Sequence, residues 1–98
     1  MDYVALGMRI RKQRKLMQMT QDQLSEKAGI SLSFLGHIER GSRKSSLETL
    51  VSLANALEVS ADYLLQDSLK IVDSVAKSQY SSSVQSLLRE LTSALREE

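Results

Sequence analysis

The side chains best suited to bind another molecule are concentrated between residues 29 and 43, in the stretch GISLSFLGHIERGSR. Ile30, Phe34 and Ile38 have the spacing of a short amphipathic helix. Gly36 interrupts this helix, although a glycine in a helix interior costs roughly 1 kcal/mol relative to alanine. The polar positions are mostly small, and the stretch ends in cations. The composition therefore indicates a helix with a shallow exposed surface and a basic end.

Residue sets for catalysis or metal binding are missing from the sequence. There is no cysteine, which excludes a disulfide framework, a thiolate metal site and a cysteine nucleophile. His37 is the only histidine, and it has no patterned carboxylate partners for a metal. A Ser/His/Asp set, a spaced carboxylate pair and a Gly-rich phosphate loop are also absent. We therefore expect no enzyme activity, no metal and no cofactor.

Charge is divided unevenly along the chain. Residues 1–44 hold nine Lys or Arg and four Asp or Glu, a formal charge of +5, whereas residues 45–98 hold four and eight, a charge of −4. A basic half favours a polyanionic partner, although chance placement of solvated charges would produce the same division.

Two features of the sequence bear on its location. Residues 1–15 lack the apolar centre of a signal peptide, and no apolar run approaches the ~20 residues of a membrane span. The expectation is a cytoplasmic protein that does not enter membranes.

Helical periodicity runs along the whole chain without β-alternation, so the predicted fold class is all-α. The first helix is expected over about residues 3–17, with Leu6, Ile10 and Leu16 on its buried side. A capping box of Thr20 and Gln23 predicts a short second helix over residues 21–28.

Serines mark the starts of the remaining predicted helices. Ser31 is expected to cap a third helix that ends near Glu39, and Gly41 is expected to stop it. Ser45 and Glu48 suggest another capping box, followed by a fourth helix. Ser60 is expected to cap a fifth helix that buries Leu64 and Leu65. The apolar residues of the fourth helix are Leu47, Leu50, Val51, Leu53, Ala54 and Leu57.

The second and third predicted helices form a helix-turn-helix pattern, since each has about two turns and only a few residues join them. Gly29 tolerates the positive φ that such a turn requires, and Ser25 supplies a small side chain where the helices approach. Helices this short are unstable alone, so the first, fourth and fifth helices must pack against them.

These residues resemble a known family. The segment TQDQLSEKAGISLSFLGHIERGSRKSSLETLVSLANALEVSADYLL is similar to the lambda-repressor-like helix-turn-helix domain of the Cro/repressor (XRE) type. The resemblance covers about residues 5–66 and implies a five-helix DNA-binding domain over residues 1–66. Gln18, Ser25 and Ser45 stand where the family often has Gly, Ala and Pro. The matching motifs are Thr20-Gln21, Ala28-Gly29-Ile30-Ser31, Ile38-Glu39-Arg40-Gly41, Ser46-Leu47-Glu48-Thr49-Leu50 and Ala61-Asp62-Tyr63-Leu64-Leu65.

The resemblance implies that the third helix is a recognition helix in the major groove of double-stranded DNA. Ser33 would bond to several bases, Leu32 would contact a thymine methyl, and His37 would donate to guanine or phosphate, or else remain an exposed spectator. Gly36 would only allow close approach, and specificity would depend partly on DNA shape and on Arg40 and Arg43. The candidate DNA-binding residues are Gln21, Ser31, Leu32, Ser33, Gly36, His37, Arg40, Ser42, Arg43 and Lys44.

Phosphate contacts are expected outside the recognition helix. Gln21 aligns with a family position that touches the DNA backbone, and amides at a helix N-terminus favour an anion. The basic loop that follows the third helix would neutralise further phosphates. Arg14 and Glu39 correspond to a structural ion pair in the family, so we expect them to stabilise the fold.

Residues 67–98 are expected to form a second, helical segment beyond the resemblance. It carries an apolar stripe at helical spacing, which a closed five-helix body would leave without a partner. We expect this stripe to form a homodimer. Folding back on the domain and binding a different protein, as in an antitoxin, are the alternatives. The residues of the stripe are Val84, Leu87, Leu88, Leu91 and Leu95.

The sequence thus predicts a transcriptional regulator, a repressor that binds a pseudo-palindromic operator as a homodimer. The alternative is an antitoxin-like or anti-repressor interaction protein whose C-terminal helices bind another protein.

Overall fold

Five helices make up the part of the chain that the computed structural model describes, residues 1–71. They are α1 (Tyr3–Leu16), α2 (Gln21–Ala28), α3 (Leu32–Arg40), α4 (Leu47–Leu57) and α5 (Ala61–Leu65). Residues 1–71 contain no strand, which confirms the predicted all-α class. The predicted stripe, Val84, Leu87, Leu88, Leu91 and Leu95, lies outside the described residues.

Each helix begins at a side-chain oxygen that accepts a hydrogen bond from a backbone N–H of the first turn. Thr20 and Gln23 form the predicted capping box of α2, and Ser31 and Ser60 cap α3 and α5. The predicted box of Ser45 and Glu48 is wrong. Ser46 caps α4 instead, since its hydroxyl accepts the Thr49 N–H at 3.1 Å and thereby satisfies an amide that has no partner within the helix.

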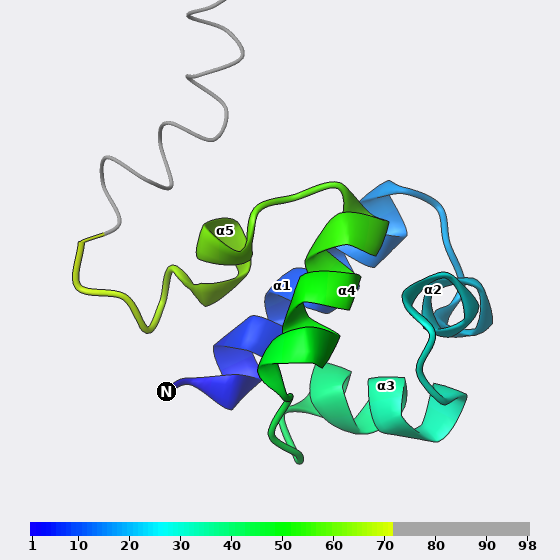
Figure 1. Ribbon diagram of the computed structural model, residues 1–98, viewed down its shortest axis with the longest axis horizontal. Helices are drawn as coiled ribbons and strands as arrows, with labels where there is room; N and C mark the ends of the chain where they lie inside the picture. Colours follow the sequence, from blue (N-terminus) through cyan, green and yellow to red (C-terminus); the bar gives the residue numbers. More distant parts are fainter. Residues whose placement is uncertain (72–98) are drawn as a thin grey trace, which may run out of the picture.

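The helices pack so that α1 contacts α3, α4 and α5, while α2 contacts α3 and α4. In Figure 1, α1 runs behind α4, α3 lies along the lower edge and α2 lies at the right. Gly7 allows α1 to approach α3, because a Cβ there would lie 2.7 Å from the carbonyl carbon of Glu39 and closer still to the carbonyl oxygens of Ile38 and Glu39. The C-terminal half of α3 is therefore held against the backbone of α1.

An aliphatic core joins the five helices. Its fully buried members include Ile10, Leu24, Leu53 and Leu64. Three apolar residues with helical spacing are not in it. Leu16 is 67% exposed at the end of α1, Leu47 is 76% exposed at the start of α4, and Val51 on the same face is 46% exposed. The prediction that Leu16 faces the interior is wrong, because the buried side of α1 follows Leu6, Ile10 and Arg14 at steps of four residues and Leu16 lies off that side.

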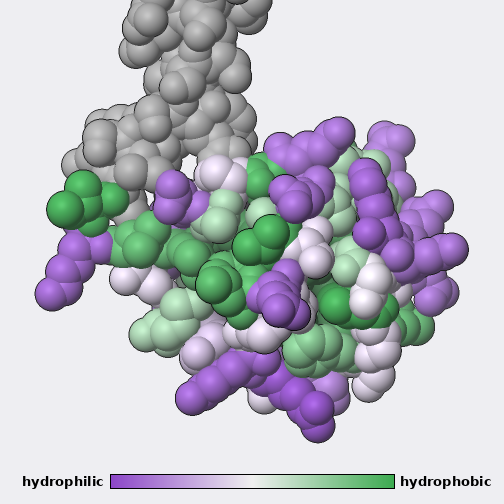
Figure 2. Space-filling view, viewed as in Figure 1, coloured by the Kyte–Doolittle hydropathy of each residue, from purple (hydrophilic) through white to green (hydrophobic). Residues whose placement is uncertain are grey.

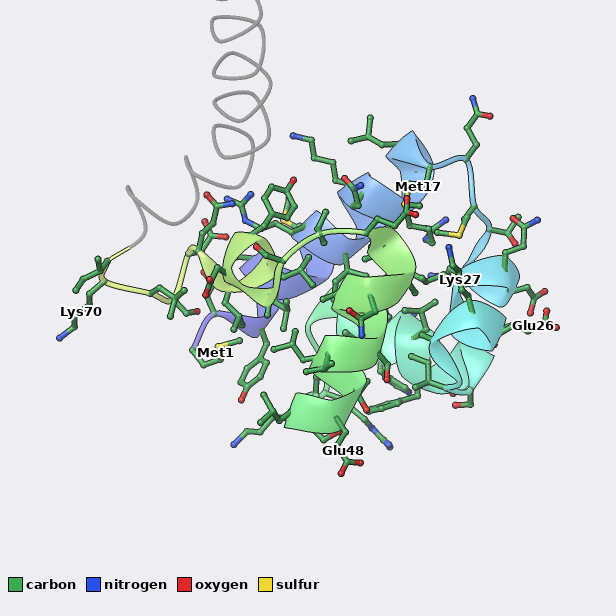
Figure 3. All side chains as sticks on the ribbon, turned by 45° about the horizontal axis from the view of Figure 1, so that its top comes forward. Met1, Met17, Glu26, Lys27, Glu48 and Lys70 are labelled. Carbon is green, nitrogen blue, oxygen red and sulfur yellow. The ribbon has the colours of Figure 1, made fainter. Side chains whose placement is uncertain are left out.

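The chain after α5 is fastened to α1. Arg9 donates to both carboxylate oxygens of Asp67, at 2.5 and 3.1 Å, and its guanidinium carbon lies 5.5 Å from the centre of the Tyr63 ring. The hydrogen bond from Arg9 lowers the pKa of Asp67 below its usual value. Ser68 accepts a hydrogen bond from the backbone N–H of Asp2 at 2.8 Å. The chain therefore leaves the domain on the side opposite α2, where Lys70 points away from the helices (Figures 1 and 3).

None of the helices within residues 1–71 has the length and apolar character to cross a membrane.

Candidate nucleic-acid interface

The turn between α2 and α3 fixes the direction of α3. Gly29 adopts φ +71°, and the Ile30 N–H donates to the Ser25 carbonyl at 3.0 Å. Ser25 is buried where the two helices meet, and its hydroxyl donates to the Asp22 carbonyl at 2.9 Å. A small side chain that satisfies its own hydroxyl can lie at this position without leaving a buried polar group unpaired. The predicted helix-turn-helix geometry is confirmed.

One side of α3 is buried and the opposite side faces solvent. Leu35, Ile38 and Glu39 are buried against the other helices, whereas Ser33 and Arg40 are exposed. Residues three and four apart on a helix share a face, so five residues form one surface. We call this surface the outer face of α3; it consists of Leu32, Ser33, Gly36, His37 and Arg40.

The structure brings most of the predicted DNA-binding residues to this surface or to its border. Ser42, Arg43 and Lys44 are exposed in the loop that follows α3. Ser31 is also exposed, but its hydroxyl already accepts the Phe34 N–H at 3.1 Å. The side chain of Ser31 therefore begins the helix, and only its second lone pair remains for another donor.

Gly36 does not leave the open surface on α3 that we expected from a residue without a side chain. It belongs to the outer face and is nevertheless buried. The guanidinium of Arg40, one turn further along α3, covers it, since a Cβ at Gly36 would lie 3.1 Å from Arg40 Nη1. The side chain of Arg40 thus folds back over α3 instead of extending beyond its end.

His37 lies between Arg40 and the following loop. Its Nδ1 is 2.9 Å from Ser42 Oγ and 3.4 Å from Arg40 Nη2. The Ser42 hydroxyl donates to the His37 carbonyl oxygen at 3.2 Å. His37 therefore connects the last turn of α3 to the loop that follows it.

A buried ion pair joins α1 to the end of α3. Arg14 Nε and Nη2 donate to the two carboxylate oxygens of Glu39 at 2.7 and 3.1 Å, which confirms the predicted pair. The two side chains are 10% and 2% exposed. Gln21, at the first position of α2, donates to Glu39 Oε1 at 3.0 Å. Glu39 therefore connects α1, α2 and α3, and it holds Gln21 beside the outer face.

A cavity of about 510 Å³ opens at the N-terminus of α2. Its lining residues include three arginines and one carboxylate, and that carboxylate is already bonded to Arg14. Backbone amides at a helix N-terminus and nearby cations attract an anion, so the cavity suits a phosphate group. The residues that line it are Arg11, Arg14, Thr20, Gln21, Glu39 and Arg40.

In the view of Figure 2, hydrophilic side chains gather at the right, over α2 and the turn before it. Figure 3 shows Glu26 pointing outward from α2, and Lys27 on the same helix is also exposed. Within residues 1–71 no group of three or more His, Cys, Asp or Glu could hold a metal ion.

Sequence reasoning missed one residue and two contacts that position the interface. Gly7 allows α1 to contact α3, and a glycine inside a predicted helix is the signal that could have revealed this close approach. The bond from Gln21 to Glu39 and the covering of Gly36 by Arg40 depend on side-chain positions that have no signal in the sequence.

Comparison with known proteins agrees with this geometry. A family model described as "Helix-turn-helix" matches residues 10–64. YazB, an uncharacterised HTH-type transcriptional regulator of Bacillus subtilis (strain 168), is 47% identical over 58 residues, which cover 59% of this chain and 84% of that protein. The chain spans only 41–51% of the length of several other curated relatives.

Solved structures share the same helices. The P22 c2 repressor in complex with a synthetic operator has a TM-score of 0.58 and 36% identity, covering 60% of this chain and 89% of that chain. A chain of the SinR protein/SinI protein complex has a TM-score of 0.64 and 28% identity, covering 93% of this chain and 94% of that chain. The arrangement of α2 and α3 therefore recurs in proteins of known structure.

Proposed function

Because the chain belongs to the helix-turn-helix family of lambda-repressor-like proteins, whose model matches residues 10–64, we propose that it binds double-stranded DNA and regulates transcription. The observation that carries this proposal is the outer face of α3, an exposed surface that lies beside the cationic cavity at α2. A helix fits the major groove, and the cavity would hold a backbone phosphate at the same time. Binding alone accounts for this function, so no catalytic step is assigned.

The candidate residues divide into two groups by their position. Ser33, His37 and Arg40 on the outer face would reach base edges, because they share the exposed side of α3. Gln21, Arg43 and Lys44 at the border would contact phosphates, which orients the protein on the duplex without reading its sequence. Such a protein would act in the cytoplasm.

We further propose that the chain acts as a homodimer, and as a repressor, on a pseudo-palindromic operator. The support is the apolar stripe of the sequence between Val84 and Leu95 and the similarity to the P22 c2 repressor, whose structure contains a synthetic operator. A dimer would place two recognition helices about one DNA turn apart, ~34 Å. Symmetric half-sites would then mirror the twofold axis of the protein.

Selection of duplex DNA from a random pool by the purified full-length protein tests this proposal. We expect an inverted repeat with half-sites about 10 base pairs apart. Affinity should fall steeply with salt, with a log–log slope of about −0.9 per neutralised phosphate, and Arg43→Ala should reduce that slope by about one unit. Lys70→Ala is the matched control, since Lys70 is a cation on the remote side of the domain (Figure 3). Failure to enrich any duplex would contradict DNA binding, and enrichment of single, unpaired half-sites would contradict the homodimer.

A second candidate is an interaction protein whose C-terminal stripe binds another protein. The similarity to a chain of the SinR protein/SinI protein complex favours it, because that structure holds two different proteins. Sedimentation equilibrium of the full-length chain distinguishes the two proposals. A dimer at micromolar concentration supports the homodimer, and a monomer favours the heterologous partner.

A further inference from the structure

The burial of Gly36 is unusual for its position on α3. Residues 33, 37 and 40 lie on the same side of the helix and are exposed or half-buried, whereas Leu35 and Ile38 lie on the opposite side in the core. Gly36 lies on the helix with the first group, yet it is buried. The covering atoms belong to Arg40, whose Nη1, Nη2 and Cζ lie 3.1, 3.7 and 3.8 Å from the position of a Cβ at residue 36. The guanidinium therefore lies in close contact with the position that a side chain at residue 36 would take, and a methyl there would displace it by a few tenths of an ångström.

This placement brings a planar cation to the middle of the outer face. Residue 36 lies half-way along α3, so the guanidinium of Arg40 is nearer to Ser33 than its own backbone position suggests. Serine and glycine project little from the helix, which leaves Arg40 as the long polar side chain over this part of the surface. In a major groove that accepts the outer face, the guanidinium would meet base edges before the exposed loop residues do.

His37 contacts the guanidinium of Arg40 from the side of the loop, and Ser42 in turn contacts His37. Arg40 Nη2 lies 3.4 Å from His37 Nδ1, and Ser42 Oγ lies 2.9 Å from the same nitrogen. Ser42 is fixed in turn, because its backbone N–H and its hydroxyl both lie within bonding distance of the His37 carbonyl oxygen, at 3.0 and 3.2 Å. Positioning before binding reduces the entropy that an arginine loses when it contacts DNA.

We infer that Arg40 reads a guanine in the major groove, and that Gly36 is a positioning residue that provides the space for its guanidinium. The inference rests on the proposed DNA binding. An arginine donates two parallel hydrogen bonds to guanine O6 and N7, which is the commonest specific contact between a side chain and a base. The other outer-face residues, Leu32, Ser33 and His37, have no fixed pair of parallel donors, so Arg40 supplies the strongest discrimination.

The test uses the full-length protein and the operator selected from the random pool. At each G·C pair of the selected half-site, guanine is replaced by 7-deazaguanine, which lacks the N7 acceptor. We expect one position at which this change weakens binding of the wild-type protein several-fold, while Arg40→Ala binds both duplexes equally. Replacing that G·C pair should weaken wild-type binding by roughly 5- to 100-fold, the range of a bidentate contact. Arg40→Lys keeps the charge without the planar fork, so it should retain non-specific binding and show a weaker guanine preference than the wild type.

Gly36→Ala separates positioning from helix stability. The added methyl displaces Arg40 by a few tenths of an ångström, whereas alanine favours the helix, so Tm should rise by several degrees while the guanine preference falls. In an Arg40→Ala background the same substitution should leave base preference unchanged. An unchanged preference in the Gly36→Ala single variant would refute the role of Gly36.

Other outcomes separate this inference from the proposed function. If Arg40→Ala and Arg40→Lys weaken binding to all duplexes uniformly, Arg40 contacts a phosphate and the inference is wrong, although DNA binding stands. If 7-deazaguanine has no effect at any position of a selected operator, the inference is wrong for the same reason. If no duplex is selected at all, the proposed function itself fails.

Discussion

Removing the charge of Glu39 should destabilise the domain more than any exposed substitution. In Glu39→Gln the guanidinium of Arg14 stays buried, with a side chain only 10% exposed, and loses its counter-charge. Glutamine keeps one acceptor oxygen, so it can replace only one of the two bonds that Glu39 accepts from Arg14 at 2.7 and 3.1 Å. An unpaired buried charge costs about 3–5 kcal/mol, and the remaining bond places the expected loss near the lower end, about 3 kcal/mol.

Thermal and urea denaturation followed by circular dichroism measure this loss. For a domain of this size, about 3 kcal/mol corresponds to a fall in Tm of roughly 10–25 °C. Glu26→Gln is the matched control, because Glu26 points into solvent from α2 (Figure 3) and its change should stay within about 0.5 kcal/mol.

A double substitution tests the reason for the effect. Arg14→Met combined with Glu39→Leu removes both charges and fills the space with apolar groups. Such replacements of a buried pair are often neutral or stabilising, so the double variant should be more stable than Glu39→Gln. A Glu39→Gln protein that loses less than about 1 kcal/mol would show that water reaches Arg14, and would refute this account of the pair.

Three further predictions concern other contacts. Gly7→Ala should destabilise the domain by about 1–3 kcal/mol or more in urea denaturation, because its methyl would overlap the carbonyl oxygen of Ile38; a neutral result would show that α1 does not approach α3 this closely. Arg9→Ala should raise the pKa of Asp67 toward its usual value in an NMR titration, since their hydrogen bond lowers it. The stabilisation from Asp67 is therefore present above the ordinary carboxyl pKa and is lost as the pH falls through the lowered pKa of the folded protein. If the stability of Arg9→Ala depended on acid pH in the same way as that of the wild type, the contact between Arg9 and Asp67 would be contradicted. Leu91→Asp should convert the proposed dimer into a monomer in sedimentation equilibrium. A variant that remains dimeric would show that the dimer interface lies outside this stripe.

Local hydrogen-bonding chemistry explains why much of the fold was predictable. The Thr20 and Gln23 box and Gly29 place both ends of α2 at the predicted residues, since each satisfies backbone groups that the helix leaves open. Ser45 and Ser46 are both suitable N-cap residues, so local chemistry does not distinguish them. The N-cap of α4 is Ser46, one residue after the predicted Ser45.

Contacts between residues distant in sequence explain what was missed. Tyr63 is buried, with Arg9 of α1 stacked near its ring, and no pattern around residue 63 reports that neighbour. Leu47 has the helical spacing of a core residue, yet it is 76% exposed while Leu50 in the same turn of α4 is buried. Periodicity identifies a face of a helix, but only packing decides how much of that face is covered.

The candidate site likewise has features that the sequence predicts and others that depend on contacts in three dimensions. The resemblance placed the exposed residues of α3 by their positions in a motif, and the structure gathers them on one face. The direction of the Arg40 side chain could not be predicted in this way, because it depends on the absence of a side chain four residues earlier and on the bond network of His37 and Ser42. Motifs specify which residue occupies a position, whereas its orientation is set by neighbours in three dimensions.

Two glycines on opposite sides of the helix-turn-helix solve different steric problems. Gly7 allows the backbone of α1 to reach the end of α3, where Glu39 ties three helices together, so a methyl there should reduce stability. Gly36 faces outward and makes room for the guanidinium of Arg40, so a methyl there should raise stability and alter base preference. Opposite signs of the change in Tm for the two Gly→Ala variants would therefore separate the residues that hold α3 in place from those that recognise DNA. If both variants lost stability together, the outer face would be part of the packing, and the separation between scaffold and recognition surface would not hold.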